Sequence, residues 1–428
     1  MNLTDIKYKI STILEGNSSK TLFINFISLL TLQGLNVILP FLTIPYLIKT
    51  VGLELFGLIT FSYTVAYFFQ IIVEYGFNTV TSREISIHSE NSTKINQIFS
   101  DVFITKILLL LFLSFIYIGL ILLIPNFSKH YNLYLIQFGC VIGQTLFPIW
   151  LFHGLQKMKY ITYINVFFKT LFTLAIFVLV KSPEDYWIAP LCTALGIINS
   201  GIASLFIVHF QFKIKLVKTS VKRIITQLKS SFYVFLSEIQ IAAISNGNIL
   251  ILGFFAGNEA VGIFTSAEKI VRAIGNLQVP LINTLFPYIS KEMRQNKTKT
   301  LKLLKNLKKY ISISLLIIII LLFFNANNIF KILYGKGFDD SILVFKIIVI
   351  FPLLSFLDQL YGKLILLTNN EEKNFMNVFL SSSILSIPLS IILSYYFSYI
   401  GLSISIIIVQ LIIVFGMYKY SKNIIKSV

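Results

Sequence analysis

Two basic residues three positions apart, Lys269 and Arg272, lie inside an apolar stretch of the chain that extends from 260 to 289. In a helix this spacing places both side chains on one face, near the middle of the stretch. Charged groups inside a long apolar helix are costly and are by default candidates for function. The pair therefore predicts a cationic site. The alternative is structural: Glu268 would pair with Arg272 at i,i+4, and Lys269 would reach a polar neighbour.

Further charged residues interrupt other apolar stretches. Lys169 lies near the middle of the stretch from 160 to 180, so it is another candidate for binding an anionic group. The acids expected to be buried in such stretches, besides Glu268, are Glu74, Glu238 and Asp358. We expect these acids either to partner the buried cations or to hold a coupling proton or sodium ion. Three more lysines lie near the ends of their stretches, where long side chains reach the polar interface. They are Lys106, Lys346 and Lys363.

These residues must be positioned by membrane-spanning helices. Of the 428 residues, 56% are hydrophobic and 13% are charged, whereas a soluble domain carries roughly 25% charged residues. Repeated apolar runs of about 20 residues are long enough to cross a ~30 Å hydrocarbon core as helices. We therefore predict an all-α membrane protein with about twelve transmembrane helices. The predicted spans are 21–48, 55–75, 101–124, 131–153, 160–180, 186–210, 231–256, 260–289, 309–325, 341–367, 374–396 and 400–420.

The basic residues are distributed unevenly on the two sides of these spans. If the N-terminus is cytoplasmic, 25 of the 36 Lys and Arg residues fall in inner segments and five in outer segments. Because short cytoplasmic loops retain positive charge, both termini are predicted to be cytoplasmic. The net charge of +18 is spread over short loops and does not form one face of a soluble domain, so no nucleic-acid partner is expected.

The two halves of the chain match each other. At an offset of 205 positions, Gly52, Glu54, Gly57 and Thr60 correspond to Gly257, Glu259, Gly262 and Thr265. At 204 positions, Phe147 and Pro148 correspond to Phe351 and Pro352. Since six helices return the chain to its starting side, the halves are expected to be parallel, pseudo-symmetric repeats about an axis along the membrane normal. The predicted parts are a cytoplasmic interfacial helix at 1–20, an N-lobe at 21–210, a basic linker at 211–230 and a C-lobe at 231–428.

The usual signatures of enzymes and cofactor sites are missing from the sequence. It contains no Walker A loop, no zinc-binding histidine pair and no nucleophile elbow, so we expect neither a cofactor nor a metal. Cys140 and Cys192 lie in apolar runs and are expected to be small core residues. The longest outer loop extends only from about 325 to 340. This disfavours a polysaccharide polymerase or ligase, because such enzymes usually need a larger extracytoplasmic platform.

Several segments, in this order, resemble one family of membrane proteins. They are PFLTIPYLIKTVGLELFG at 40–57, YGFNTVTSREIS at 75–86, WLFHGLQKMKY at 150–160, GNEAVGIFTSAEKIVRAI at 257–274 and LFPYISK at 285–291. The set is similar to the polysaccharide-unit flippases (Wzx-like oligosaccharide translocases), which belong to the superfamily of multidrug and lipid II exporters. The resemblance covers nearly the whole chain. It departs from the family pattern at His153, where a Gln is common, and at Phe264, where a Tyr is common.

The resemblance implies two six-helix lobes around a central cavity that opens alternately to the inner and the outer side. It implies that the protein flips undecaprenyl-diphosphate-linked oligosaccharide repeat units from the inner to the outer leaflet of the bacterial inner membrane. Lys269 and Arg272, together with Lys169, would then bind the diphosphate or acidic sugars, while the polyprenyl tail stays among the membrane lipids. A polysaccharide polymerase and glycosyltransferases are further expected partners.

A multidrug or cation antiporter of the same superfamily is the main alternative. Such a transporter usually needs acidic groups for its cationic substrates. The excess of Lys and Arg near mid-membrane argues against it.

Overall fold

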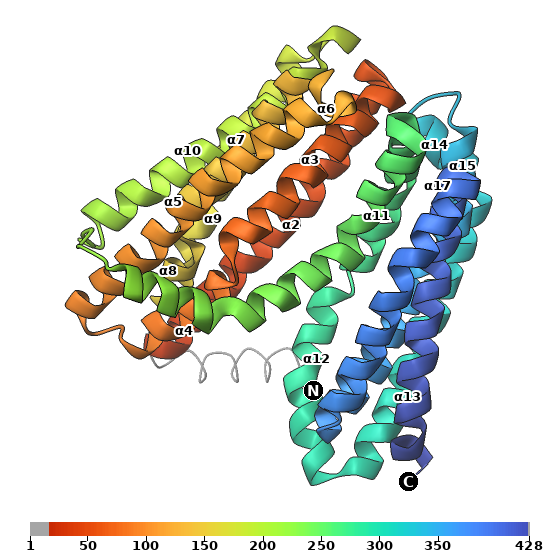
Figure 1. Cartoon of the computed structure of the whole chain (residues 1–428). Helices are drawn as coiled ribbons and strands as arrows, with labels where there is room; N and C mark the ends of the chain where they lie inside the picture. Colours follow the sequence, from red (N-terminus) through yellow and green to blue (C-terminus); the bar gives the residue numbers. More distant parts are fainter. Residues whose placement is uncertain (1–16, 427–428) are drawn as a thin grey trace. The chain divides into compact units, whose positions relative to one another are not determined.

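The computed structural model describes residues 17–426, and the side chains of 31–36 and 38–425 (Figure 1). Most of the predicted interfacial helix, namely residues 1–16, lies outside the described residues. The first helices are α2 (Asn17–Val51), α3 (Leu53–Glu74), α4 (Phe77–Ile87), α5 (Ser92–Leu123), α6 (Pro125–Ser128), α7 (Tyr131–Leu146), α8 (Ile149–Gly154), α9 (Met158–Leu179), η1 (Pro183–Trp187) and α10 (Ile188–Phe210). They are followed by α11 (Val221–Asn276), α12 (Val279–Gln295), α13 (Lys297–Phe324), α14 (Ala326–Leu333), α15 (Asp339–Ile348), α16 (Phe351–Gln359), η2 (Leu360–Leu366), η3 (Leu367–Asn369) and α17 (Glu372–Lys426).

The predicted fold class is confirmed. Among the described residues, ten helical stretches are long and apolar enough to cross a membrane. Two of them, Val221–Gln295 and Glu372–Ile425, each hold two predicted spans, so every predicted span has a helical counterpart. Large apolar side chains on the outer surface of α5, such as Phe115 and Leu123, are exposed, as expected for residues that face lipid tails. The chain is a multi-pass membrane protein.

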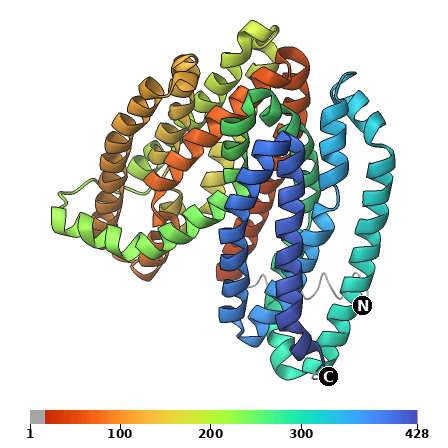
Figure 2. The same cartoon turned by 45° about the vertical axis from the view of Figure 1, so that its right-hand side comes forward.

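The two long stretches turn at single residues with a positive backbone angle. Gly257 interrupts α11 at φ 82°, and Ser398 interrupts α17 at φ 50°. The two parts of α17 run antiparallel, as Figures 1 and 2 show, and the hydroxyls of Ser390 and Ser405 form a 2.9 Å hydrogen bond between them. Glycine is the residue that adopts a positive φ without steric cost, which explains its presence at position 257.

Helices break at corresponding positions of the two sequence repeats. Proline cannot donate a backbone hydrogen bond and ends or bends a helix. Pro148 separates α7 from α8, and its repeat partner Pro352 is at the first turn of α16, just after α15 ends. The turn before α3 is made by Gly52 at φ 86°, and its repeat partner is Gly257 at φ 82°. The predicted duplication is therefore visible in the backbone conformation.

The described residues divide into two compact units. The first unit comprises 17–43 and 62–242, and the second comprises 44–61 and 243–426. In the first unit α5, α7, α9 and α10 lie side by side (Figure 1), and aromatic side chains such as Phe77, Trp150 and Phe152 are fully buried in its core. The core of the second unit includes Phe356 and Met417. The predicted lobes at 21–210 and 231–428, with a linker between them, stay a prediction.

Candidate functional site

The first unit contains a cavity of about 440 Å³ among α2, α3, α9 and α10. We call it the Lys169 cavity. Its volume is within the range of about 300 to 1,000 Å³ that is typical of ligand pockets. The polar side chains that line it are Asn36, Thr43, Lys169, Thr173 and Thr193, together with Tyr63. None of its lining residues, all of which belong to the described part of the chain, is acidic.

Lys169 is the cation of this cavity. It is eleven residues from the start of α9 at Met158, which is roughly 16 Å at 1.5 Å per residue and thus deep in the span. Its Nζ donates a 2.8 Å hydrogen bond to Oδ1 of Asn36 on α2. It forms no ion pair with the described residues. Since an ammonium has three N–H donors, two remain for a ligand.

The polar partners of Lys169 could not be assigned from the sequence. Asn36 is a polar residue inside the predicted span 21–48, which marks it as unusual but does not say what it faces. Thr43 and Thr193 donate their hydroxyl protons to carbonyl oxygens of their own helices, so their oxygens remain as acceptors in the cavity. The cavity therefore offers a cation, an amide and hydroxyl groups.

Lys269 and Arg272 lie in the second unit on α11, and the structure gives them different surroundings. Arg272 donates through Nε to the Glu268 carboxylate and through Nη2 to the carbonyl oxygen of Ser245 at 2.7 Å. Lys269 is half-buried and makes no hydrogen bond or ion pair with the described residues. The arginine thus has the i,i+4 partner that the structural alternative expects, and the lysine has free donors.

One cavity beside Arg272 is small. It has a volume of about 20 Å³ and is lined by Glu268, Arg272 and apolar side chains. That volume accommodates about one water molecule and neither a diphosphate nor a sugar. A role of Lys269 and Arg272 as ligands of the head group stays a prediction.

Glu74 has a cationic partner, which is Lys106. Nζ of Lys106 lies 2.9 Å from Oε1 of Glu74, and the Lys106 side chain is fully buried. The sequence predicts that Lys106, near the end of a span, reaches the polar interface, and this prediction is wrong. Because the side chain is paired and buried, it does not reach the polar interface. The other Glu74 oxygen accepts a 2.8 Å hydrogen bond from Nδ2 of Asn78.

The remaining two acids have neutral partners. The backbone amide of Gly76, in the turn after α3, donates to the carboxylate of Glu238 on α11. In the second unit, Nε2 of Gln410 on α17 donates to Asp358 on α16. Among the described residues, neither acid forms an ion pair. Of the four candidate acids, Glu74 and Glu268 are paired with a cation, and Glu238 and Asp358 are not. A role in ion coupling stays a prediction for all four.

The family of the chain follows from comparison with known sequences. A family model described as polysaccharide biosynthesis protein matches residues 22–293. A protein of Escherichia coli (strain K12), named "Putative O-antigen transporter", is 30% identical over 399 residues, covering 93% of this chain and 96% of the relative. The chain belongs to the polysaccharide biosynthesis protein family. A second relative, from Shigella dysenteriae and with the same name, is 27% identical and covers 93% of this chain and 99% of its own.

Membership in the polysaccharide biosynthesis protein family agrees with the resemblance seen in the sequence, and solved structures agree with the fold. The structure of "Lipid II flippase MurJ, inward closed conformation" matches with a TM-score of 0.70 at 15% identity, covering 94% of this chain and 87% of that one. A multidrug resistance MATE family transporter of the MOP superfamily, in its inward-facing conformation, matches with a TM-score of 0.67 at 12% identity, covering 91% and 95%. At these identities the likeness concerns the fold alone.

Proposed function

We propose that the protein is a flippase that moves undecaprenyl-diphosphate-linked oligosaccharide repeat units from the inner to the outer leaflet of the bacterial inner membrane. The Lys169 cavity is the observation that carries this proposal, because it combines a mid-span cation with hydroxyl and amide groups. A diphosphate needs cationic donors, and sugars need hydrogen-bonding groups, neither of which lipid tails supply. The names of the two relatives support the same substrate class.

The proposed mechanism starts with the head group in the Lys169 cavity. The diphosphate replaces the Asn36 amide oxygen as the acceptor of Lys169, because an ammonium binds a charged phosphate oxygen more strongly than a neutral amide oxygen. The hydroxyls of Thr43, Thr173 and Thr193 bind the sugar, while the polyprenyl tail remains in the bilayer. Alternating access of the cavity then transfers the head group. Lys269, in the second unit, is a further candidate cation for the anionic head group in this proposal.

The absence of acids from the cavity lining disfavours a cation antiporter, which would need an acidic partner for its substrate. In the proposed orientation both termini are cytoplasmic. Glycosyltransferases then supply the substrate on the inner side, and a polysaccharide polymerase uses the product on the outer side. The chain itself acts as a transporter and catalyses no covalent step.

The test compares Lys169→Gln with Lys169→Arg in a strain that lacks the native gene. Loss of the charge should reduce surface polysaccharide on the order of tenfold at equal protein in the membrane, since a hydrogen bond to a charged group contributes roughly 1.5 to 3 kcal/mol. Lys169→Arg should retain most of the transport. Lys129→Gln, which neutralises an exposed lysine of the same unit, is the control and should behave as wild type. Normal transport by Lys169→Gln would overturn the proposal.

A further inference from the structure

A second cavity, of about 370 Å³, lies in the second unit between α13, η2 and the last part of α17. Lys302, Lys305 and Lys308 of α13 line one side, and Tyr361 and Tyr418 line the other. Leucine and isoleucine side chains complete the walls. We call this the three-lysine cavity. It shares no residue with the Lys169 cavity, and its volume also is within the range of ligand pockets.

The three lysines are repeated every third residue, which keeps them on one side of α13 over roughly 9 Å. Like charges at this spacing repel each other, so the arrangement is unfavourable unless an anion compensates it. None of the three forms an ion pair with a described acid. Nζ of Lys308 lies 5.4 Å from the centroid of the buried Tyr361 ring, a cation–π contact that holds the ammonium at the cavity wall.

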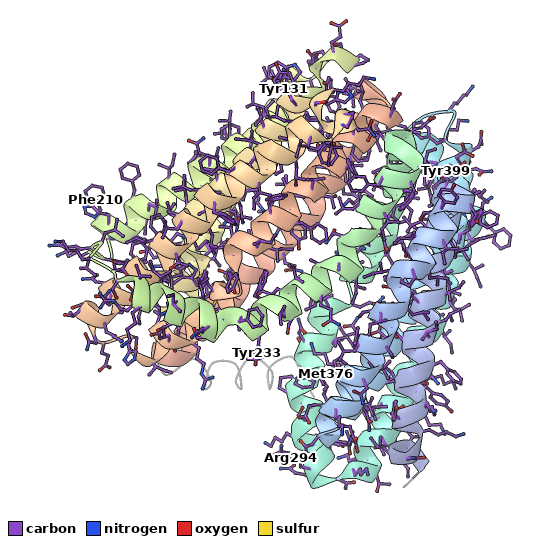
Figure 3. The ribbon with its side chains drawn as sticks, in the orientation of Figure 1. Tyr131, Phe210, Tyr233, Arg294, Met376 and Tyr399 are labelled. Atoms are coloured by element: carbon purple, nitrogen blue, oxygen red, sulfur yellow. The ribbon has the colours of Figure 1, made fainter. Side chains whose placement is uncertain are left out.

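The position of the cavity along α13 narrows the class of ligand. The first part of this helix is basic, and from Ile311 onward it is an apolar span whose side chains, such as Ile317 and Leu321, are exposed. The three-lysine cavity therefore lies where the helix passes from the polar interface to the lipid-facing surface. In Figure 3 the labelled Arg294 marks the end of the second unit at which α12 meets α13 and this basic segment begins. Tyrosines near an interface anchor helices at the level of the head groups.

The wall of the cavity that contains Tyr361 has unusual backbone geometry. Tyr361 belongs to η2, a seven-residue π-helix between α16 and η3. Short π-helical segments are rare and occur frequently at functional sites. Gly362, the next residue, contacts Phe375 so closely that an added Cβ would lie 2.9 Å from Cε2 of that ring. The segment is thus packed tightly behind Tyr361, and the ring is held beside the lysines.

We propose that the three-lysine cavity binds the phosphate head group of an anionic membrane phospholipid, with the acyl chains along the apolar surface of α13. The cavity provides three ammonium donors and two phenol groups for the phosphate, and apolar walls for the glycerol and the first methylenes. Basic pockets between transmembrane helices are suited to such head groups. The site goes beyond the proposed transport function and does not depend on it, because the phospholipid is a resident of the bilayer.

The test uses the full chain, purified and placed in nanodiscs of phosphatidylcholine alone or mixed with phosphatidylglycerol. Native mass spectrometry measures the retained lipid. The wild type should retain phosphatidylglycerol in preference to phosphatidylcholine. The triple variant Lys302→Gln, Lys305→Gln, Lys308→Gln should lose this preference by on the order of a hundredfold, since each lysine near an anionic head group contributes about fivefold. In phosphatidylcholine alone its melting temperature should equal that of the wild type, which shows that it folds.

The matched control is Lys297→Gln, Lys299→Gln, Lys309→Gln, which removes the same charge from the same helix but from outside the cavity lining. It should retain phosphatidylglycerol as the wild type does. If both triple variants lost the preference for phosphatidylglycerol equally, the lipid would be attracted by the overall charge of the helix, and the proposed site would be wrong. Displacement of the lipid by inorganic phosphate at comparable concentration would overturn the assignment to a phospholipid. Unchanged retention by the cavity variant would also overturn it.

Discussion

A Cβ atom on Gly57 would lie 2.6 Å from the backbone nitrogen of Gly262, its repeat partner 205 positions further along the chain. The helices that follow the two equivalent turns therefore contact each other through their backbones. Parallel repeats require the two turns to lie on the same side of the membrane, and this close approach of the helix starts supports that prediction. Glycine at both positions permits this approach, because any side chain would meet the backbone of the partner helix.

Replacing Gly57 by Ala should destabilise the protein. The added methyl group would meet the backbone of Asn258 and Gly262, which cannot rotate away as a side chain does. We expect a loss of about 1 to 3 kcal/mol, the usual cost of overpacking, seen as a lower melting temperature in detergent. The control is Gly119→Ala in α5, where an added Cβ meets nothing within 4 Å. If both variants melt at the wild-type temperature, the close contact is wrong.

The features of the fold that local sequence determines could be predicted, and the others could not. The spans depend on local apolarity, and the turns at Gly52 and Gly257 depend on a backbone conformation that favours one residue type, so the sequence predicts both. The helix starts were less predictable. α13 begins at Lys297 and not near 309, since a helix continues past the bilayer into segments whose charged residues have no apolar signal.

For the candidate site, the sequence predicts the charged residues but not most of their partners. The cations Lys169, Lys269 and Arg272 stand out because charge is rare inside spans. Their partners depend on which helices pack together, and local sequence carries no such information. The Lys106 and Glu74 pair joins residues 32 positions apart. The Lys169 and Asn36 contact joins residues 133 positions apart. The Glu268 and Arg272 pair, four positions apart in one helix, could be predicted from the sequence.

The ion pair between Lys106 and Glu74 gives a second prediction. Lys106→Met should cost about 3 to 5 kcal/mol, because it leaves the Glu74 carboxylate buried without a cation. Adding Glu74→Gln to that variant should recover most of the loss, which thermal unfolding of the two proteins would measure. Lys129→Met is the comparison, since Lys129 is exposed and forms no ion pair with the described residues, so it should change stability by no more than about 0.5 kcal/mol. A double variant as unstable as Lys106→Met would contradict the pairing.

The third prediction concerns orientation. A cysteine introduced by Lys305→Cys, or one in place of the C-terminal Val428, should resist an impermeant thiol reagent in intact cells, because the basic segments are predicted to be cytoplasmic. The same reagent should label Lys336→Cys, an exposed position in the outer segment between α14 and α15. The native Cys140 and Cys192 are buried and should give little background. Ready labelling at 305 or 428 would show that the predicted topology is wrong.

The last prediction separates the two roles of the charges on α11. Lys269→Gln removes a side chain without hydrogen bonds to the described residues, so it should reduce surface polysaccharide while the protein level in the membrane stays normal. Arg272→Gln should reduce both, because Glu268 is buried and would lose its cation. Arg272→Lys should lose less than Arg272→Gln, since a lysine keeps a cation beside Glu268 but cannot reproduce both directed contacts, to Glu268 and to the Ser245 carbonyl.

Replacing Glu268, Lys269 and Arg272 by Gln together decides between these roles. No buried charge then lacks a partner, so the amount of folded protein should return to normal. If Lys269 binds the head group, transport should still be lost, because the cation that attracts the diphosphate is gone. The measurement is the fraction of lipid-linked sugar that reaches the outer leaflet at equal expression. Transport at the wild-type rate by this triple variant would show that the three charges only fix the position of the helix.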